Sequence, residues 1–323
     1  MDIEQKTRFD TEFEQEVHEG LTAFPKYLSS KYFYDKKGDK LFQQIMALPE
    51  YYLTDCEFNI IKQHTTELAQ LFQAEEGFDL IELGAGDGKK TKILLGHLHE
   101  NNINFSYKPI DISSDVLAEL KSSVKDTWPK IHINTQQGTY FKTLKKLNTI
   151  SNRKKVILVL GSNIGNLRHP EAIEFLRNIG NSMTADDLLF MGFDQKKSPD
   201  IILAAYNDRQ GVTERFNKNV LTRINRELDA DFNPDNFKHW PTYNPESGTA
   251  KSYLISTKRQ EVNLNKIDLS ISFEPWESIH TEISQKYDDS IVEWLAKEAD
   301  LALSHRFADE KNYFKDYIFR KKE

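Results

Sequence analysis

A glycine-rich turn, Glu82-Leu83-Gly84-Ala85-Gly86-Asp87-Gly88, has the clearest chemical potential in this chain. It follows a predicted strand at 78–83 and precedes a predicted helix that carries several leucines. Glycine tolerates positive φ angles and lets a bound molecule approach the backbone closely. A strand, a glycine turn and a helix in this order therefore indicate a ligand that contains a nucleotide or nucleoside.

Three kinds of nucleotide site compete for this turn. A Walker loop fails because Gly88-Lys89-Lys90-Thr91 stands at the wrong spacing from Gly84, and a dinucleotide site fails because Lys89 replaces the third glycine. The pattern acidic-x-G-x-G-x-G, with Glu82 as its acidic residue and Gly84 and Gly86 as its first glycines, is typical of enzymes that bind S-adenosylmethionine. Asp111 ends the next predicted strand and could accept hydrogen bonds from both hydroxyls of a ribose. A turn whose glycines serve packing alone is the remaining alternative.

A second loop, residues 161–167, follows an unbroken apolar strand at 155–160. In open α/β sheets, ligands bind beyond the carboxyl ends of the strands, so this loop faces the same edge as the glycine turn. Asn166 offers both a carbonyl and an NH₂ group, which suit the polar head of an amino acid. Asparagine and glycine also suit plain turns, so the loop alone leaves both interpretations open.

The elements that must position these loops alternate between strand and helix. We predict strands at 78–83, 107–112, 131–136, 155–160 and 188–193, separated by helices. Such alternation predicts a doubly wound parallel α/β sheet. Thr54-Asp55-Cys56-Glu57 has the form of a capping box, which predicts that a helix begins there.

The alternation stops after residue 193. Residues 200–232 read as mostly helical and residues 233–248 as turn-rich, and strands resume at 250–256 and 267–273. The last strand alternates apolar and polar residues, which is typical of a half-exposed antiparallel sheet. We therefore predict two domains: residues 55–196 with 287–323 bind the cofactor, and residues 1–54 with 197–286 form a mixed α+β domain for the substrate.

The composition limits the class of function. The chain has 323 residues, with 43 lysines and arginines against 50 acidic residues, so its formal charge is −7. Nucleic acids and anionic membranes need a basic face, and neither is expected as a partner. The single cysteine, Cys56, excludes an intrachain disulfide and a cysteine zinc cluster. Without a predicted signal or membrane span, we expect a cytoplasmic protein, with no metal and as a monomer.

Several motifs together resemble the histidine-specific Nα-methyltransferases of ergothioneine biosynthesis, over nearly the full length. The resemblance rests on the N-terminal aromatic segment 32–54, the loop at 160–167, the helical segment 216–232 and Thr281-Glu282-Ile283-Ser284-Gln285-Lys286-Tyr287. It implies a class I methyltransferase fold, S-adenosylmethionine as the cofactor, and trimethylation of the α-amino group of L-histidine to hercynine.

The resemblance also implies roles for individual residues. The cofactor would be held by Gly84, Gly86, Lys90, Asp111, Thr139 and Tyr140, the last two beside the adenine. The substrate would contact Gly161, Asn166 and Tyr206 near its carboxylate, Tyr51, Glu282 and Ser284 around its imidazole, and Tyr34 at its amine. Tyr34 and Asn166 are the candidates for orienting the amine during methyl transfer.

One part of this assignment has its own support in the residues. In a strand, residues i and i+2 share a face, so Glu282 and Ser284 project together while Ile279, Thr281 and Ile283 point into the core. A carboxylate and a hydroxyl suit the two nitrogens of an imidazole. From spacing alone, the solvated face of an edge strand is the alternative.

The chain departs from the family pattern at two positions. Thr139 stands where an aspartate would face the adenine, and Ser252 replaces a bulkier apolar residue near the substrate ring. Tryptophan or tyrosine as the amino acid, and a non-catalytic S-adenosylmethionine sensor, are the alternatives to histidine methylation.

Overall fold

The computed structural model describes residues 9–148 and 153–322. The chain forms two compact units, each built from two separate stretches of sequence. The sheet unit comprises residues 53–196 and 285–323, and the mixed unit comprises residues 1–52 and 197–284. Among the described residues, no helix is both long and apolar enough to cross a membrane.

The sheet unit is built on one eight-stranded sheet. Its strands are β2 (Phe78–Leu83), β3 (Phe105–Asp111), β4 (His132–Ile133), β5 (Gln136–Gln137), β6 (Lys154–Val159), β7 (Leu188–Asp194), β13 (Leu301–Ala308) and β14 (Phe314–Lys321). They lie in the order β13-β14-β7-β6-β2-β3-β4, and β5 also pairs with β3. The strands from β2 to β7 are parallel, whereas β14 is antiparallel to both β7 and β13. The predicted doubly wound sheet is therefore confirmed.

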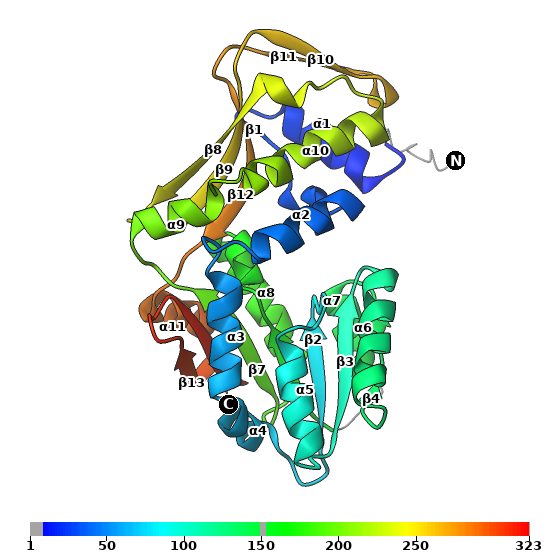
Figure 1. Ribbon diagram of the computed structural model, residues 1–323, viewed down its shortest axis with the longest axis vertical. Coiled ribbons are helices and arrows are strands. Elements are labelled where there is room, and N and C mark those ends of the chain that lie inside the picture. The colour runs from blue at the N-terminus through cyan, green and yellow to red at the C-terminus, as the bar shows by residue number, and fades with distance from the viewer. Residues whose placement is uncertain (1–8, 149–152, 323) are drawn as a thin grey trace, which may run out of the picture. The chain divides into compact units, whose positions relative to one another are not determined.

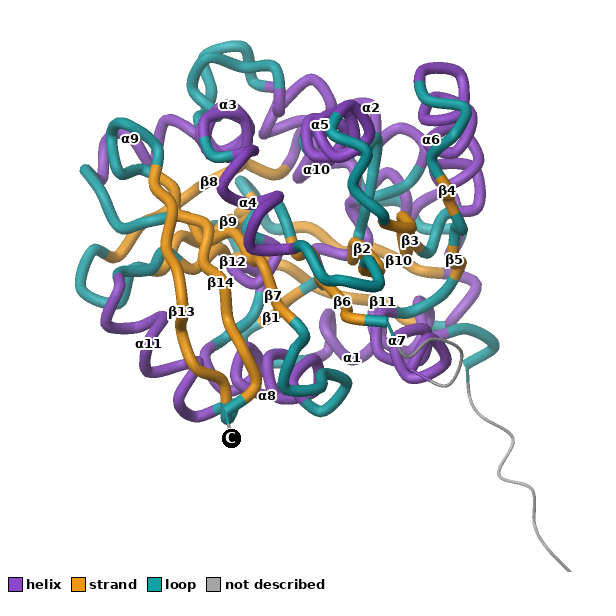
Figure 2. Tube along the Cα trace, turned by 90° about the horizontal axis from the view of Figure 1, so that it is seen from below, coloured by secondary structure: helices purple, strands orange, loops and turns teal. Residues whose placement is uncertain are grey.

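Helices cover both faces of this sheet (Figure 2). One side carries α3 (Leu53–Gln63), α4 (Thr65–Phe72), α5 (Thr91–Glu100) and α6 (Ser114–Thr127); the other carries α7 (Tyr140–Asn148), α8 (His169–Gly180) and α11 (Asp289–Glu298). Every residue of β2 and β7 is buried, which explains why the central strands read as continuous apolar runs.

The order of the strands reverses between β2 and β6. From β2 the chain builds outward to β3 and β4, and from β6 it builds in the opposite direction to β7 and β14. Ligands of doubly wound sheets bind at such a reversal, beyond the carboxyl ends of the strands. The glycine turn follows β2 and the loop at 161–167 follows β6, so both predicted motifs flank this point.

The mixed unit combines a four-stranded sheet, in the order β1-β12-β9-β8, with a separate hairpin (Figure 1). Its strands are β1 (Lys26–Tyr27), β8 (Phe237–Asn244), β9 (Thr249–Ser256), β10 (Gln260–Leu264), β11 (Leu269–Phe273) and β12 (Ser278–Gln285). Its main helices are α1 (Glu12–Thr22), α2 (Lys36–Met46), α9 (Pro199–Tyr206) and α10 (Val212–Leu228). The apolar face of α10 is buried in the core of this unit, beside α2.

Two local predictions are wrong, and two helices near the N-terminus were not predicted. Residues 233–248 contain β8, which is an edge strand, and an edge tolerates Pro241 because no neighbour needs its missing N–H. The first fifty residues form α1 and α2, although they show no clean helical stripe. The capping box fails because α3 already begins at Leu53, and Glu57 is fully buried with its carboxylate engaged elsewhere.

Candidate cofactor and substrate sites

The glycine turn after β2 leaves one stretch of backbone open. Gly84 and Gly86 have φ angles of 73° and 52°, in the left-handed region. A Cβ atom on Gly84 would lie 2.6 Å from the hydroxyl oxygen of Tyr140, so a larger residue would displace that tyrosine. A Cβ atom on Gly86 would meet no atom within 4 Å. A ligand can therefore approach the backbone at Gly86, while the Tyr140 hydroxyl lies against Gly84.

Asp111 stands at the end of β3, next to this turn. One of its carboxylate oxygens accepts from the backbone N–H of Ser113 at 3.0 Å, and the other lies 3.4 Å from the backbone nitrogen of Gly86. A carboxylate has about four acceptor positions, so capacity remains for a pair of hydroxyl donors. Burial and the nearby Asp111 raise the pKa of Tyr140 to about 12, and the phenol therefore keeps its proton at neutral pH.

Lys90, at the start of α5, is tied to the loop after β6 through Glu57. The ammonium of Lys90 pairs with the Glu57 carboxylate, whose two oxygens accept from the backbone N–H of Gly161 at 2.9 and 2.8 Å. A Cβ atom on Gly161 would lie 3.8 Å from the Lys90 nitrogen. Sequence reasoning missed Glu57 because its position in the Thr54 motif indicates a helix cap.

The loop at 161–166 is fixed by further hydrogen bonds. The Ser162 hydroxyl accepts from the backbone N–H of Asp194 at 2.9 Å, and the Tyr287 hydroxyl donates to the carbonyl of Ile164 at 3.1 Å. The side-chain amide of Asn163 lies within 3.8 Å of the positions that Cβ atoms would take on Gly84 and Gly161. Asn163 therefore stands between the two loops. Nothing in the sequence distinguishes it from Asn166, the neighbour that we predicted.

The sheet unit thus brings together most of the predicted cofactor residues. Gly84 and Gly86 follow β2, and Asp111 ends β3. Lys90 and Tyr140 stand at the starts of α5 and α7, and Thr139 is an exposed residue before α7. An open backbone, a carboxylate for a diol and an ammonium for a carboxylate fit the chemistry of S-adenosylmethionine. Asn166 is exposed at the end of the same loop that begins at Gly161.

The predicted imidazole-binding residues lie in one corner of the mixed unit. The Tyr206 hydroxyl, at the end of α9, donates to the Ser284 hydroxyl on β12 at 2.6 Å. The Ser252 hydroxyl on β9 donates to the Glu282 carboxylate at 3.2 Å. Ser252, which departs from the family pattern, therefore places a hydroxyl against Glu282, the carboxylate predicted to bind the imidazole. Ser252 and Ser284 are buried, and Glu282 is half-buried.

The strand that carries these groups is less regular than predicted. Ile279 and Thr281 are buried as expected, but Ile283 is only half-buried. The Thr281 hydroxyl donates to the side-chain carbonyl of Asn217 on α10 at 2.9 Å. This bond ties the middle of β12 to the helix that fills the core of the mixed unit.

His239, on β8, forms a hydrogen bond with the backbone of Tyr206. Its Nε2 atom lies 2.9 Å from the Tyr206 carbonyl oxygen, and since a carbonyl only accepts, Nε2 carries the proton. Burial lowers the pKa of His239, so the ring stays neutral at physiological pH. Sequence reasoning missed His239 because its segment reads as turn-rich. Tyr51, also predicted for the ring site, packs in the same small apolar cluster as Tyr206.

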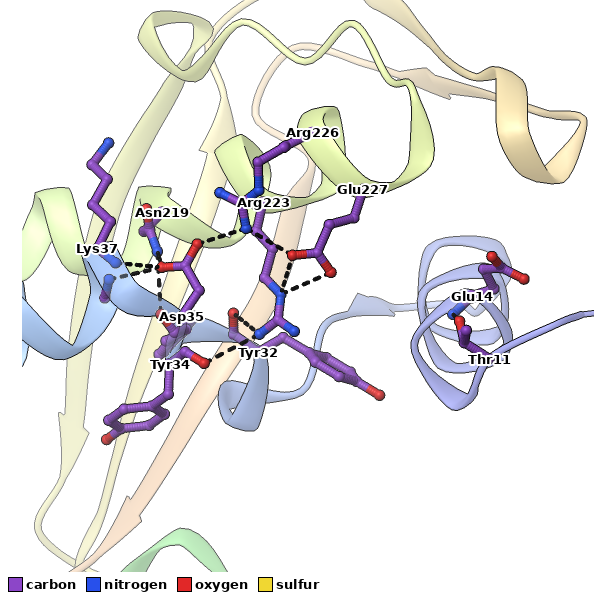
Figure 3. A network of polar contacts seen from close by, with 12 residues as sticks. Thr11, Glu14, Tyr32, Tyr34, Asp35, Lys37, Asn219, Arg223, Arg226 and Glu227 are labelled. Atoms are coloured by element: carbon purple, nitrogen blue, oxygen red, sulfur yellow. Dashed lines mark hydrogen bonds and ion pairs between the residues drawn. The ribbon is translucent and has the colours of Figure 1, made fainter. Parts of the chain in front are cut away.

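Tyr34 lies in the segment after η1 (Ser30–Phe33). A polar clamp, formed by Arg223, Asn219 and Asp35, holds the backbone there, as Figure 3 shows. The Arg223 guanidinium donates to the carbonyls of Tyr32 and Tyr34, both at 3.3 Å. The Asn219 amide donates to the carbonyl of Phe33 at 3.2 Å and to Asp35 at 2.8 Å. Both donors come from α10, so the backbone on either side of Tyr34 is fixed to that helix.

Asp35 closes the clamp by capping α2. Its carboxylate accepts from the backbone N–H groups of Lys37 at 3.1 Å and Gly38 at 2.8 Å, and the Arg226 guanidinium donates to it at 2.8 Å (Figure 3). A Cβ atom on Gly38 would lie 1.8 Å from the Phe33 carbonyl oxygen, so this crossing admits only glycine.

An aromatic cluster surrounds Tyr34 within the mixed unit. Its ring packs edge-on against Phe42 and Phe216, with centroids 5.5 and 5.3 Å away, and Phe42 lies 6.2 Å from the ring of Tyr51. Tyr34 nevertheless remains 40% exposed. Two predicted substrate residues, Tyr34 and Tyr51, therefore belong to one cluster of rings.

Comparison with known proteins identifies the family. The family described as "Histidine-specific methyltransferase, SAM-dependent" matches residues 13–321. The chain is 35% identical to the histidine N-alpha-methyltransferase of Mycolicibacterium smegmatis over 91% of its own length and 90% of that protein. It is 34% identical to the Mycobacterium tuberculosis protein of the same name, over 86% and 85% of the two chains. It is 27% identical to ergothioneine biosynthesis protein 1 of Schizosaccharomyces pombe, over 91% of this chain and 39% of that protein. The chain belongs to the family of histidine-specific, S-adenosylmethionine-dependent methyltransferases.

Proposed function

We propose that this enzyme transfers three methyl groups in succession to the α-amino group of L-histidine, giving hercynine for ergothioneine biosynthesis. Membership of the family supports the cofactor and the amino acid. The observation that carries the choice of histidine is the corner of the mixed unit where Glu282 meets Ser252 and Ser284 meets Tyr206. An imidazole needs an acceptor for one nitrogen and a donor for the other, and a carboxylate beside a hydroxyl supplies both.

The proposed cofactor residues divide by chemistry. Bound S-adenosylmethionine supplies an activated methyl group on a sulfonium. We propose that the Lys90 ammonium pairs with its carboxylate, that Asp111 accepts from its ribose hydroxyls, and that Gly84 and Gly86 let it approach the backbone. Thr139 and Tyr140 are proposed to lie beside the adenine, with the Thr139 hydroxyl in the place of the family's aspartate.

The proposed substrate residues orient the amine rather than activate the methyl group. An α-ammonium has no lone pair, so it must lose a proton before each transfer. We propose that Tyr34 and Asn166 hold the neutral amine and that Gly161 and Tyr206 hold the carboxylate, while Tyr51 contacts the imidazole. Correct orientation alone supplies several kcal/mol in reactions of this kind. The rings around Tyr34 also favour the trimethylammonium product through cation–π attraction.

The proposed substrate is a free amino acid. The formal charge of −7 and the lack of a basic stripe support a small molecule over a nucleic acid. A monomeric enzyme in the cytoplasm is the corresponding proposal for its state, and a single cysteine, Cys56, fits a reducing compartment because it cannot form an intrachain disulfide.

Mass spectrometry of a reaction with S-adenosylmethionine and an equimolar mixture of the standard amino acids tests this function. We expect histidine to gain one, two and three methyl groups, and Glu282→Gln to raise the KM for histidine by about tenfold or more. Glu261→Gln, which changes an exposed carboxylate on β10, is the matched control. Methylation of tryptophan or tyrosine instead would overturn the proposed selectivity, and cofactor binding without any methylated product would favour a sensor.

A further inference from the structure

Two carboxyl groups lie buried together beneath the loops of the sheet unit. Glu57 on α3 and Asp316 on β14 are both fully buried. Asp316 is opposite Gly192 in the pairing of β14 with β7, and a Cβ atom on Gly192 would lie 2.2 Å from a carboxylate oxygen of Glu57. The Glu57 carboxylate therefore occupies the space of a side chain at 192, directly beside Asp316.

Glu57 connects the two sides of the strand-order reversal. It accepts from the Gly161 N–H, at the end of β6, and pairs with Lys90, which stands before α5 on the side of β2. A single buried carboxylate thus fixes both the loop after β6 and the cation that we propose for the cofactor carboxylate. Losing either contact would leave the other group displaced or unpaired.

The surroundings of Asp316 favour the protonated form of its carboxyl group. Among the residues that the structure describes, no hydrogen-bond donor reaches either of its carboxyl oxygens. Burial, and then the charge of Glu57, raises the pKa of Asp316 well above its usual range, while Lys90 acts in the opposite direction. A protonated Asp316 can donate its O–H to Glu57, and the group of Glu57, Asp316 and Lys90 is then electrically neutral.

We propose that Asp316 carries a proton at neutral pH and donates it in a hydrogen bond to Glu57, and that the two act as positioning residues that hold Lys90 and the Gly161 loop in the geometry for S-adenosylmethionine. The inference rests on the proposed role of Lys90. When Asp316 loses this proton, two adjacent buried anions compete for Lys90 and the loop loses its fixed anchor. The Glu57 charge also raises the pKa of Glu82, which is a further titratable group near this pair.

Infrared difference spectroscopy on the full chain reads the proton directly. The spectrum of the wild type minus that of Asp316→Asn should contain the carbonyl band of a protonated carboxylic acid at neutral pH. Glu82→Gln, subtracted in the same way, separates the contribution of Glu82. Carboxyl-carbon NMR of aspartate-labelled wild type gives the same answer if the variant folds poorly. Absence of the band or of a protonated aspartate at neutral pH would overturn the inference.

Kinetics then test the positioning role. The amide of Asp316→Asn can still donate to Glu57 and cannot ionise, so we expect the KM for S-adenosylmethionine to stay within about twofold at neutral pH and no longer to rise in alkali. Asp316→Ala, which removes the donor, should raise that KM by about tenfold. Equal KM values for the two variants, or pH profiles of wild type and Asp316→Asn that superimpose, would overturn the role. An unchanged KM in Lys90→Met would instead refute the proposed role of Lys90.

Discussion

Glu57 in the sheet unit and Asp35 in the mixed unit perform the same task in opposite surroundings. Each carboxylate accepts from backbone N–H groups and pairs with a cation, and each thereby fixes a segment that carries proposed site residues. The Glu57 side chain is fully buried. The Asp35 side chain is 11% exposed and its partner, Arg226, is 52% exposed.

The difference shows how the environment sets the cost of the same contacts. Water can replace a lost partner of Asp35 but does not reach the fully buried Glu57 carboxylate, whose charge would stay unpaired, although Lys90 itself is 17% exposed. Burial also links the sheet unit to pH, because it raises the pKa values of Glu82 and Asp316. Around Asp35 the hydrogen bonds of Gly38, Asn219 and Arg226 outweigh partial burial and lower the pKa of the carboxyl. We therefore expect larger and more pH-dependent mutational effects in the sheet unit.

Glu57→Ala should have the largest effect. It removes the fully buried carboxylate that pairs with the mostly buried Lys90 ammonium and accepts from the half-buried Gly161 N–H, and breaking a buried ion pair costs about 3–5 kcal/mol of unfolding free energy. Urea unfolding monitored by circular dichroism measures this cost. A loss as small as that expected for Asp35→Ala would remove the contrast between the two carboxylates.

Glu82→Gln should change the pH dependence of stability. Burial raises the pKa of Glu82 from 4.5 to about 7, against the hydrogen bonds from Thr91 and Tyr107. A raised folded pKa means that this group stabilises the fold most below about pH 4.5 and loses that contribution as the pH rises to about 7. The variant should therefore gain stability relative to wild type over this window, by on the order of 3 kcal/mol. Parallel curves of unfolding free energy against pH would contradict the assignment.

Asp35→Ala should have an intermediate effect. The variant loses the cap of α2 together with the contacts from Asn219 and Arg226, so we expect a loss of about 1–2 kcal/mol in unfolding free energy. Because Tyr34 sits next to Asp35, kcat should also fall. Asp35→Asn keeps the cap and serves as the control. A kcat of Asp35→Ala equal to that of wild type would mean that the contacts of Asp35 do not position Tyr34.

Arg226→Gln should have the smallest effect. Its ion pair with Asp35 lies at the surface, where such pairs contribute about 0–1 kcal/mol, and salt screens what remains. The melting temperature should change by nearly the same amount between low and high salt for the wild type and the variant. A loss comparable to that of Glu57→Ala would mean that exposure does not set the cost in this protein.

Much of the fold follows from local patterns in the sequence. The apolar run before Gly161 and the strand before Gly84 predict β6 and β2 closely, since both are buried on two faces and carry no competing signal. The edge strand β8 was missed because Pro241 and the neighbouring turn residues hide it, and its stability depends on pairing with β9 rather than on its own pattern.

The candidate sites were predictable to a different extent. Gly84, Asp111 and Glu282 stand in recognisable motifs, whereas Glu57, Asp316 and His239 act on segments far away in the chain. In the sequence, Glu57 has the position of a helix-capping residue. Its partners in the structure, Lys90 and Gly161, come together only after the sheet has formed. Long-range partners of buried groups leave no spacing that a single sequence could reveal.

The central claim is a division of labour, with the cofactor on the sheet unit and the imidazole on the mixed unit. Steady-state kinetics of Lys90→Met and Glu282→Gln, with both substrates varied, test it most directly. We predict that Lys90→Met raises the KM for S-adenosylmethionine and leaves the KM for histidine within about twofold, and that Glu282→Gln does the reverse. If both variants raised the KM for the same substrate, the proposed division would be contradicted.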